Sequence, residues 1–555
     1  MANKVFGIDL GTTYSCIAHV DEYGRPAIII NADSQHTTPS VVLFDSPTDV
    51  VVGAQAKRQA RIRPDDVAVL VKRHMGEADW RFAAHGQEYS APAVSSQILK
   101  SLAGDAARAT GGTVSDVVIT VPAYFGDEER KATKLAGELA GLNVVDIINE
   151  PTAAAFSYGF AQEGSTTQTV LVYDLGGGTF DSTVITLSDK KIDVIATDGD
   201  HALGGSDWDD RLAQYLSQKF REAAPNAGDP LDDTYGAQDL ITSAEDVKQA
   251  LTGRESVDAL VVFGADRASV TITRQAFEEL SSALLERTIE LTQKVLAAAE
   301  EKGVHKIDKV LLVGGMSKMP CVARRLAEVF PDLPPAELTD PDLAVAKGAA
   351  IYGQKKELES YVISDLVAQG KLAEGQSLAD VNPVDLHKAV ANTASEYGLA
   401  STAVADLVQT EISNVTSRGF GVIVLDRETD SEQVDFLAHA NDSLPITISQ
   451  VYYTNVDDQR LVQVQVVEQA TSVESTLPED NKIIIEGPID DIPAGFPRGT
   501  PVEVTFVMGR DQTIEVTARH AAVAQPLVLR IEVGVSSSAM REEEQIKVDL
   551  LKQKS

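Results

Sequence analysis

Residues 170–181 read Val-Leu-Val-Tyr-Asp-Leu-Gly-Gly-Gly-Thr-Phe-Asp. The apolar run that ends at Asp174 predicts a buried strand that stops at a glycine turn. Because glycine has no Cβ atom, backbone N–H groups in the turn can approach a phosphate closely. Asp174 and Asp181 offer oxygen ligands suited to Mg²⁺, either directly or through its water shell.

The same pattern occurs near the N-terminus, where residues 5–13 read Val-Phe-Gly-Ile-Asp-Leu-Gly-Thr-Thr. Asp9 here takes the place of Asp174. A single glycine turn is most often only a turn. Two copies, each at the end of an apolar strand, instead predict two phosphate-binding β-hairpins that face each other across a cleft.

Bulk composition limits the classes of function. A chain of 555 residues is too long for one core, so two or more domains are expected. Lys and Arg number 48 against 83 Asp and Glu, a net charge of −35, which argues against nucleic-acid and anionic-membrane partners and otherwise favours solubility. Cys16 and Cys321 are interpreted as core residues. The N-terminus has no signal-peptide pattern and no apolar run is of membrane length, so a cytoplasmic protein is expected.

Two charged residues near the hairpins each have two interpretations. Lys72 follows an apolar run, and it is either a surface charge or a group directed at phosphate. Glu150 lies between a strand and a helix that begins near Pro151. It either holds a catalytic water or merely complements the helix dipole.

A series of motifs follows along residues 4–354: Gly7–Ser15, Val121–Phe125, Ile148–Ala155, Asp174–Asp181, Leu203–Gly205 and Val313–Gly315. In order and spacing they resemble the seventy-kilodalton heat-shock chaperones, also called the DnaK-type family. The wider actin and sugar-kinase superfamily shares the hairpins but not the run Asn149–Ala155.

The resemblance implies an α/β, actin-like, two-lobed ATPase domain with Mg·ATP in its cleft. Phosphoryl transfer depends mainly on positioning and charge stabilisation, which suits such a site. The implied catalytic residues are Lys72, Glu150, Asp9, Asp174, Asp181 and Thr179, of which the three aspartates would also surround the metal. The implied nucleotide-binding residues are Gly11, Thr12, Thr13, Tyr14, Gly176, Gly177, Gly178, Gly204, Gly205, Glu245, Lys248, Thr252, Gly314, Gly315, Lys318 and Asp342. An interdomain switch is implied for Pro122 and Arg130.

The chain departs from the family pattern at several positions. Gln249 and Lys318 stand where the family has Arg, and Thr252 replaces Ser. A guanidinium stacks on adenine better than an amide or an ammonium, so looser adenine binding is expected. Asp146 stands where the family has an Arg that meets its J-domain partner, and this charge reversal argues against that partner.

Beyond residue 354 the pattern changes twice. Residues 355–417 predict a helical connector, with Leu358, Val362 and Leu366 at helical spacing, in place of the family's short apolar linker. Residues 418–535 alternate with period two and predict an all-β sandwich. It resembles the family's peptide-binding domain, with Val462 at the pocket centre and Tyr452 at its rim. Without the resemblance, Val462 would be an ordinary core valine.

The predicted domains are residues 1–354, an ATPase; 355–417, a helical connector; 418–535, a peptide-binding β-sandwich; and 536–555, a short tail without the family's lid. The predicted function is an ATP-dependent chaperone of the stress-response type. Its expected partners are extended apolar segments of unfolded proteins, with a nucleotide-exchange factor as a further candidate. The alternatives are a nucleotide-sensing scaffold for one dedicated partner and a small-molecule kinase of the same superfamily.

Overall fold

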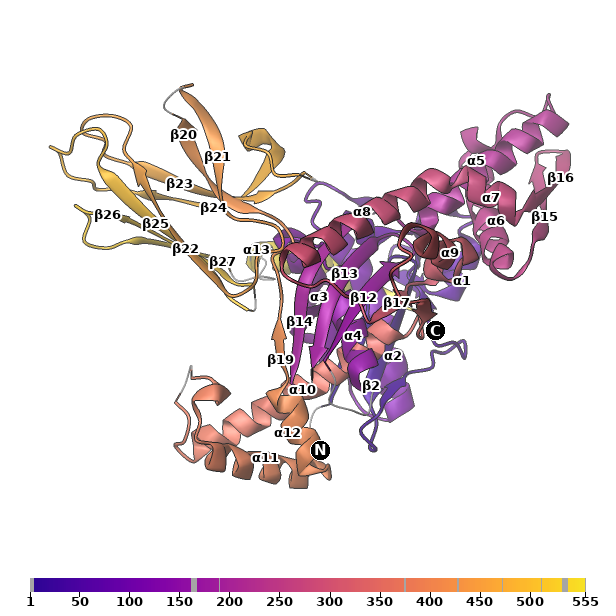
Figure 1. Cartoon of the computed structure of the whole chain (residues 1–555). Coiled ribbons are helices and arrows are strands. Elements are labelled where there is room, and N and C mark those ends of the chain that lie inside the picture. The colour runs from indigo at the N-terminus through magenta and orange to yellow at the C-terminus, as the bar shows by residue number, and fades with distance from the viewer. Residues whose placement is uncertain are drawn as a thin grey trace. The chain divides into compact units, whose positions relative to one another are not determined.

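The computed structural model describes residues 4–160, 167–188, 190–373, 376–426, 429–471, 473–510, 512–531 and 538–554 (Figure 1). The chain divides into two compact units. The first contains residues 1–192, 198–411 and 536–555, and the second contains residues 193–197 and 412–535. Small parts of the predicted segments, among them residues 374–375, 532–537 and 555, lie outside the described residues.

Two mixed sheets, built mainly from residues of the first unit, share one plan. In each sheet a β-hairpin is extended by a parallel strand, because β1 pairs with β2 and β10 as β12 pairs with β13 and β17. The sheet orders are β11-β10-β1-β2-β3, with β4 beside β2, and β18-β17-β12-β13-β14-β19. The strands are β1 (Val5–Asp9), β2 (Tyr14–Val20), β3 (Pro26–Ile28), β4 (Thr38–Pro39), β10 (Asp116–Val121), β11 (Asn143–Asn149), β12 (Gln168–Leu175), β13 (Phe180–Ser188), β14 (Lys191–Asp200), β17 (Lys309–Val313), β18 (Ala336–Leu338) and β19 (Glu411–Ser413). The predicted repeat is therefore present in the backbone.

Close packing fixes the central strand β1. It carries Phe6 and Ile8, both buried, as expected for a strand covered on both faces. A Cβ atom at Gly7 would lie 2.1 Å from the backbone nitrogen of Ala350 in α10 (Ala344–Ala368). A Cβ atom at Gly348 would lie 1.6 Å from a backbone oxygen of α4 (Glu150–Phe160). Glycine is required at both contacts, which bring α4 and β1 against the same helix.

Further elements complete the first unit. The small sheets are β28-β6-β5-β7, β8-β9 and β15-β16. Their strands are β5 (Val42–Phe44), β6 (Asp49–Val52), β7 (Val67–Ala68), β8 (Phe82–Ala84), β9 (Gln87–Tyr89), β15 (Ser256–Phe263), β16 (Asp266–Thr273) and β28 (Lys552–Gln553). The helices are α1 (Ala54–Gln59), α2 (Ala91–Thr110), α3 (Asp127–Leu139), α5 (Gly205–Ala223), α6 (Thr234–Gly253), α7 (Arg274–Leu280), α8 (Ser282–Glu301), α9 (Pro320–Val329), and the short 3-10 helices η2 (Val71–His74) and η4 (Gly315–Lys318).

The predicted connector is helical but it begins inside a longer element. Helix α10 continues unbroken across the boundary predicted at residue 354, and it buries Leu358, Val362 and Leu366 on one face. It is followed by α11 (Pro383–Tyr397) and α12 (Ser401–Gln409). Asn382 caps α11 through its side chain, and Gly398 ends it in the left-handed conformation. These helices belong to the first compact unit.

The second unit contains two four-stranded antiparallel sheets, β21-β20-β23-β24 and β22-β25-β26-β27. The strands are β20 (Phe420–Asp426), β21 (Ser431–Ala438), β22 (Ile446–Tyr453), β23 (Val462–Gln469), β24 (Asn481–Ile489), β25 (Pro501–Met508), β26 (Ile514–His520) and β27 (Leu527–Ile531). One apolar cluster takes residues from both sheets, including Val466 and Phe506. The period-two alternation predicted for residues 418–535 corresponds to eight strands in the described part of this range.

The segment predicted as a short tail contains regular structure in its described residues, 538–554. It forms α13 (Ser538–Asp549) and β28, and it belongs to the first unit. Among the described residues, no helix combines the length and the apolar character that crossing a bilayer requires.

Candidate functional site

The glycine turns of the two hairpins meet in the first unit. A Cβ atom at Gly177 would lie 2.0 Å from Thr13 Oγ1, and one at Gly178 would lie 2.3 Å from Thr12 Cγ2. Both distances are far below van der Waals contact, so only glycine permits this approach. The two copies therefore face each other, as the sequence predicted.

A cavity of about 430 Å³ opens beside these turns. Its volume is in the range of small-molecule binding sites. The predicted site residues that line it are Asp9, Gly11, Thr12, Thr13, Tyr14, Lys72, Glu150, Asp174, Gly176, Gly177, Thr179, Gly205, Glu245, Lys248, Thr252, Gly314, Gly315, Lys318 and Asp342. Asp181, Gly178 and Gly204 do not line it. Gly178 and Gly204 instead lie against each other, where a Cβ atom at Gly204 would come 2.4 Å from the Gly178 nitrogen.

Three aspartates lie close to one another near the glycine turns, and Asp174 and Asp181 among them are buried. Asp174 and Asp181 are register partners across the β12–β13 hairpin, and Asp9 ends β1. Burial, with the negative charge of Glu150 next, raises the pKa of Asp9 to about 7 and that of Asp181 to about 8. Burial likewise raises the pKa of Asp174 well above its usual value, again with Glu150 as the next cause. Burial and the neighbouring negative charge therefore disfavour the ionised form of all three carboxyl groups.

This charge distribution suits a hydrated cation. A cation placed among the aspartates would lower their pKa values, because it favours the ionised form. Within the described ranges, no three His, Cys, Asp or Glu side chains are grouped to hold a metal ion by direct ligation. Carboxylate oxygens are donors that Mg²⁺ accepts directly or through its waters, so the donor set fits the ion, and its place among these aspartates stays a prediction.

Lys72 and Glu150 form a buried ion pair at the cavity. Lys72 Nζ donates to Glu150 Oε1 at 2.5 Å, and the two residues are only 5% and 7% exposed. Lys72 comes from η2 and Glu150 is the first residue of α4. The interpretation of Lys72 as a surface charge is wrong, because the fold buries its ammonium beside four carboxylates. Lys72 is also one of the residues that line the cavity, so its ammonium is available to a ligand there.

The opposite side of the cavity is formed by α6 and the loop after β17. Lys248 Nζ donates to Asp209 Oδ2 at 2.6 Å and to the carbonyl oxygen of Gly205 at 2.7 Å. Burial raises the pKa of Asp209 to about 6, although Lys248 opposes the shift. Gln249 and Lys318, the two departures from the family pattern, also line the cavity. Gln249 donates to Glu245 at 3.1 Å, and Lys318 is paired with Asp342.

Sequence reasoning missed Lys57, which reaches the site from α1. Its Nζ donates to Glu245 Oε1 at 2.6 Å and to Tyr14 Oη at 2.9 Å. Burial alone would lower the pKa of Lys57, but Glu245 and Tyr14 outweigh that effect and the net shift is upward. No local pattern marks this lysine, because its partner lies 188 residues away.

Arg73, next to Lys72, was also missed. Its Nε donates to the carbonyl oxygen of Gly178 at 3.0 Å, and its two terminal nitrogens bind Asp207. Asp207 in turn accepts from the backbone nitrogen of Gly204 at 2.7 Å. Arg73 thereby ties the glycine turn of the second hairpin to the start of α5. The adjacent basic pair was a signal for it in the sequence.

Comparison with protein families agrees with this geometry. The family model described as Hsp70 protein matches residues 5–368. The chain belongs to the Hsp70 family. Members of this family are ATPases that typically bind ATP or ADP with magnesium, and their ATPase domain has the actin-like fold. The match ends at the last residue of α10, so the predicted boundary at residue 354 lies inside the matched region.

Two predictions drawn from the Hsp70 family concern residues outside the cavity. Pro122 follows β10, and the buried Arg130 donates to Phe125 O at 3.1 Å and to Asn149 Oδ1 at 2.5 Å. In the second unit, Val462 begins β23 and Tyr452 lies in β22, and both pack against the core of that unit. Their switch and peptide-binding roles stay predictions.

Asp146, which departs from the Hsp70 pattern, has partners in α10. It accepts a hydrogen bond from Tyr352 Oη at 2.7 Å, and Lys356 Nζ lies 2.9 Å from its carboxylate. The negative charge that the sequence places there is therefore offset locally.

Proposed function

We propose that the first unit binds Mg·ATP and hydrolyses it to ADP and phosphate, and that the second unit binds extended apolar peptide segments. The chain then acts as an ATP-dependent chaperone. The observation that carries this proposal is the cavity itself. It joins two facing glycine turns, the carboxylates of Asp9 and Asp174 and a buried lysine in a chain of the Hsp70 family.

The phosphates would lie at the glycine turns. Backbone N–H groups of Thr12, Thr13 and Gly177–Thr179 would donate to phosphate oxygens, assisted by the threonine hydroxyls. Bound Mg²⁺ would neutralise charge on the transferred phosphoryl group, and Asp9, Asp174 and Asp181 would hold it through its waters.

Lys72 and Glu150 would position the γ-phosphate and the attacking water. The ammonium of Lys72 is already desolvated, so it can exchange Glu150 for a phosphate oxygen without first leaving bulk water. Glu150 would then accept a hydrogen bond from the attacking water and hold it in line with the γ-phosphate. Both steps need the two side chains to remain near each other, which their positions on η2 and α4 provide.

The nucleoside would lie between α6 and the loop at Gly314 and Gly315. Lys248 is held in place by Asp209, while Gln249 and Lys318 offer an amide and an ammonium where a planar guanidinium would stack. The adenine ring would therefore be held mainly by shape and by polar contacts.

The second unit carries the proposed peptide site near the turn between β22 and β23. Tyr452 and Val462 flank this turn, and it exposes apolar side chains at Tyr453 (53%), Val456 (57%) and Leu461 (50%). β22 is also an edge strand of its sheet. Exposed apolar groups beside strand backbone are what an extended apolar peptide would bind.

The partners follow from this proposal. Extended segments of unfolded proteins would occupy the second unit, and a nucleotide-exchange factor would act on the first. A J-domain partner is not favoured, because Asp146 replaces the basic residue and is already engaged by Lys356.

The test measures steady-state ATP hydrolysis and peptide binding on the full chain. We expect Mg²⁺-dependent release of phosphate and binding of several unrelated apolar peptides. Phosphate transferred to a metabolite would instead identify a kinase. Hydrolysis with one stable protein partner, and no suppression of aggregation of unrelated unfolded proteins, would identify a scaffold.

A further inference from the structure

The C-terminal segment returns to the first unit after the chain has formed the second one. Residues 538–554, called the C-terminal clasp below, form α13 and β28 and belong to the same compact unit as α1, α2 and α6 (Figure 1). The second unit is thus joined to the first through the chain at both of its ends. The contacts of the clasp indicate that its position has consequences for the nucleotide cavity.

Two apolar side chains and one acid anchor the helix of the clasp. Val548 (0% exposed) and Leu551 (7%) belong to the main apolar core of the first unit. Glu544 is buried, and its carboxylate accepts a hydrogen bond from Ser90 Oγ at 2.8 Å. Ser90 is the N-cap of α2, so the negative charge lies at the positive end of a helix dipole. Apolar packing and the hydrogen bond between Ser90 and Glu544 therefore hold the clasp on the first unit.

The strand of the clasp adds an edge to the sheet β28-β6-β5-β7. Lys552 N donates to Thr48 O at 2.7 Å, and Lys554 N donates to Val50 O at 2.9 Å. The two strands are parallel, with Lys552 opposite Asp49. Gln553 Nε2 also donates to the carbonyl oxygen of Gln97 in α2 at 2.5 Å. These bonds fix the register of β28 on β6.

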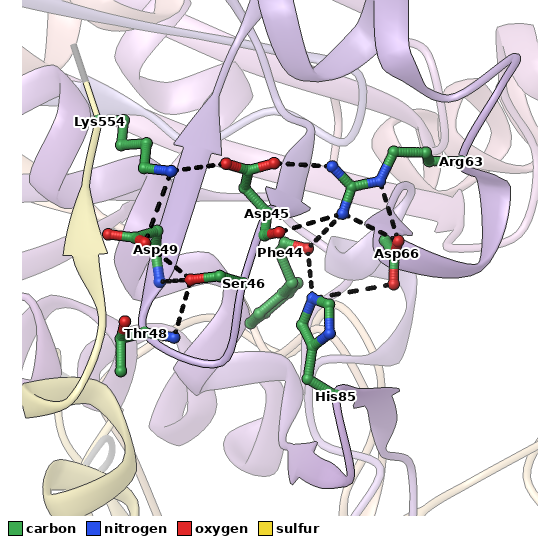
Figure 2. A network of polar contacts seen from close by, with 9 residues as sticks. All are labelled: Phe44, Asp45, Ser46, Thr48, Asp49, Arg63, Asp66, His85 and Lys554. Atoms are coloured by element: carbon green, nitrogen blue, oxygen red, sulfur yellow. Dashed lines mark hydrogen bonds and ion pairs between the residues drawn. The ribbon is translucent and has the colours of Figure 1, made fainter.

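A charged network connects the end of the clasp to the residues that follow α1 (Figure 2). Lys554 Nζ lies 2.6 Å from Asp45 Oδ2 and 3.5 Å from Asp49 Oδ2. The other oxygen of Asp45 accepts from Arg63 Nη1 at 2.7 Å. Arg63 also pairs with Asp66 at 3.0 Å. Asp45 is therefore held between a cation of the clasp and a cation just beyond α1.

Helix α1 connects residues that the clasp contacts to a residue that lines the nucleotide cavity. Only Gly53 separates the end of β6 from the start of α1. Lys57 of α1 pairs with Glu245 of α6, and Glu245 lines the cavity. Arg61, just beyond α1, lies 3.5 Å from Asp239 and 3.4 Å from Asp246 of the same helix α6. The clasp contacts the chain on both sides of α1, at β6 and, through Asp45, at Arg63.

We propose that the C-terminal clasp holds α1 in the position in which Lys57 pairs with Glu245 at the cavity, and so slows nucleotide release. Undocking of the clasp frees β6 and the turn at Arg63 together, which lets α1 move away from α6. This regulation rests on the proposed nucleotide site. The clasp can undock locally, because it is a short segment held by two apolar side chains, the hydrogen bonds of Glu544 and Gln553, the main-chain bonds of β28 and partly exposed ion pairs.

The first test compares two leucines of the clasp in the full chain. Leu551→Asp places a charge in the core and opens the clasp, whereas Leu550→Asp makes the same change at an exposed position of the clasp (61% exposed). Release of a fluorescent ADP analogue is followed by stopped flow. We expect release at least about fivefold faster in Leu551→Asp and unchanged in Leu550→Asp. Equal rates in the two variants would overturn the proposal.

A second pair of variants covers the case in which Leu551→Asp fails to fold. Lys554→Glu turns the contact with Asp45 and Asp49 into repulsion, and Lys552→Glu makes the same charge change at an exposed neighbour. Release should accelerate only in Lys554→Glu. In a Lys57→Met background, where the pair with Glu245 is already lost, Lys554→Glu should add nothing further. Full additivity would show that the clasp does not act through α1.

Hydrogen exchange separates failure of this proposal from failure of the nucleotide site. The Lys57 backbone amide, bonded to Gly53 O at 3.0 Å, should exchange faster in Lys554→Glu than in Lys552→Glu without any nucleotide. If ATP does not bind by calorimetry but exchange changes as expected, the proposed function fails and the clasp still positions α1. If ATP binds and exchange near α1 is unchanged, the clasp proposal is overturned.

Discussion

Lys72→Met should separate the stability of the first unit from its catalytic activity. The substitution keeps the volume of the side chain but removes the charge that pairs with Glu150 at 2.5 Å. Breaking a buried ion pair from one side costs about 3–5 kcal/mol, because the other charge stays buried without its partner. Three further aspartates surround this position and increase the repulsion. We expect a loss of unfolding free energy of about 3 kcal/mol, and a fall in kcat of at least about a hundredfold, roughly 2.7 kcal/mol of barrier.

The double variant Lys72→Met with Glu150→Gln separates the effect on stability from the effect on kcat. Removing both charges leaves no unpaired ion, so most of the stability should return, whereas kcat should stay low. Urea unfolding and steady-state ATPase measurements check the two effects. Lys131→Met is the matched control, since Lys131 pairs with the buried Asp127 at 2.5 Å and neither residue lines the cavity. It should lose stability but keep kcat. Recovery of turnover in the double variant would show that the pair is purely structural.

Three other outcomes are expected. Gln249→Arg with Lys318→Arg should tighten ATP binding by about 1 kcal/mol for each restored stack, and equal or weaker affinity by calorimetry would contradict the argument. Peptide should stimulate ATP hydrolysis only a few-fold, and ATP should change peptide affinity by under about tenfold (1.4 kcal/mol), as measured by fluorescence anisotropy. The hydrogen bond from Lys554, ahead of that from Arg63, lowers the pKa of Asp45 below its ordinary 3.8. The Tm advantage of the native chain over Lys554→Met should therefore be complete at pH 7 and shrink as the pH falls below about 4, and a difference that grows in acid would refute the assignment.

The sequence by itself determined the local parts of the site. Both hairpins could be predicted because an apolar strand, an acid and glycines are adjacent in the chain, and strand and turn formation depend on neighbouring residues. The same holds for the helical spacing of Leu358, Val362 and Leu366, which the structure buries on one face of α10. The boundary predicted at residue 354 falls inside α10, which continues to Ala368. The helical pattern of the sequence does not change at residue 354, so it could not show where this helix ends.

Only the tertiary structure decided which distant residues meet. Lys72 could be read as exposed or buried from its spacing, and the fold settled the question by closing α4 and the aspartates around it. Lys57 and Glu245 are 188 residues apart in the sequence. Strand β28 of the clasp pairs with β6, although Lys552 and Asp49 lie near opposite ends of the sequence. Local sequence patterns do not indicate such contacts. In the sequence, Lys57 and Glu245 have the pattern of ordinary surface charges, and the clasp has that of a short polar tail. Their energies arise from burial and proximity, which exist only after the separate segments have packed together.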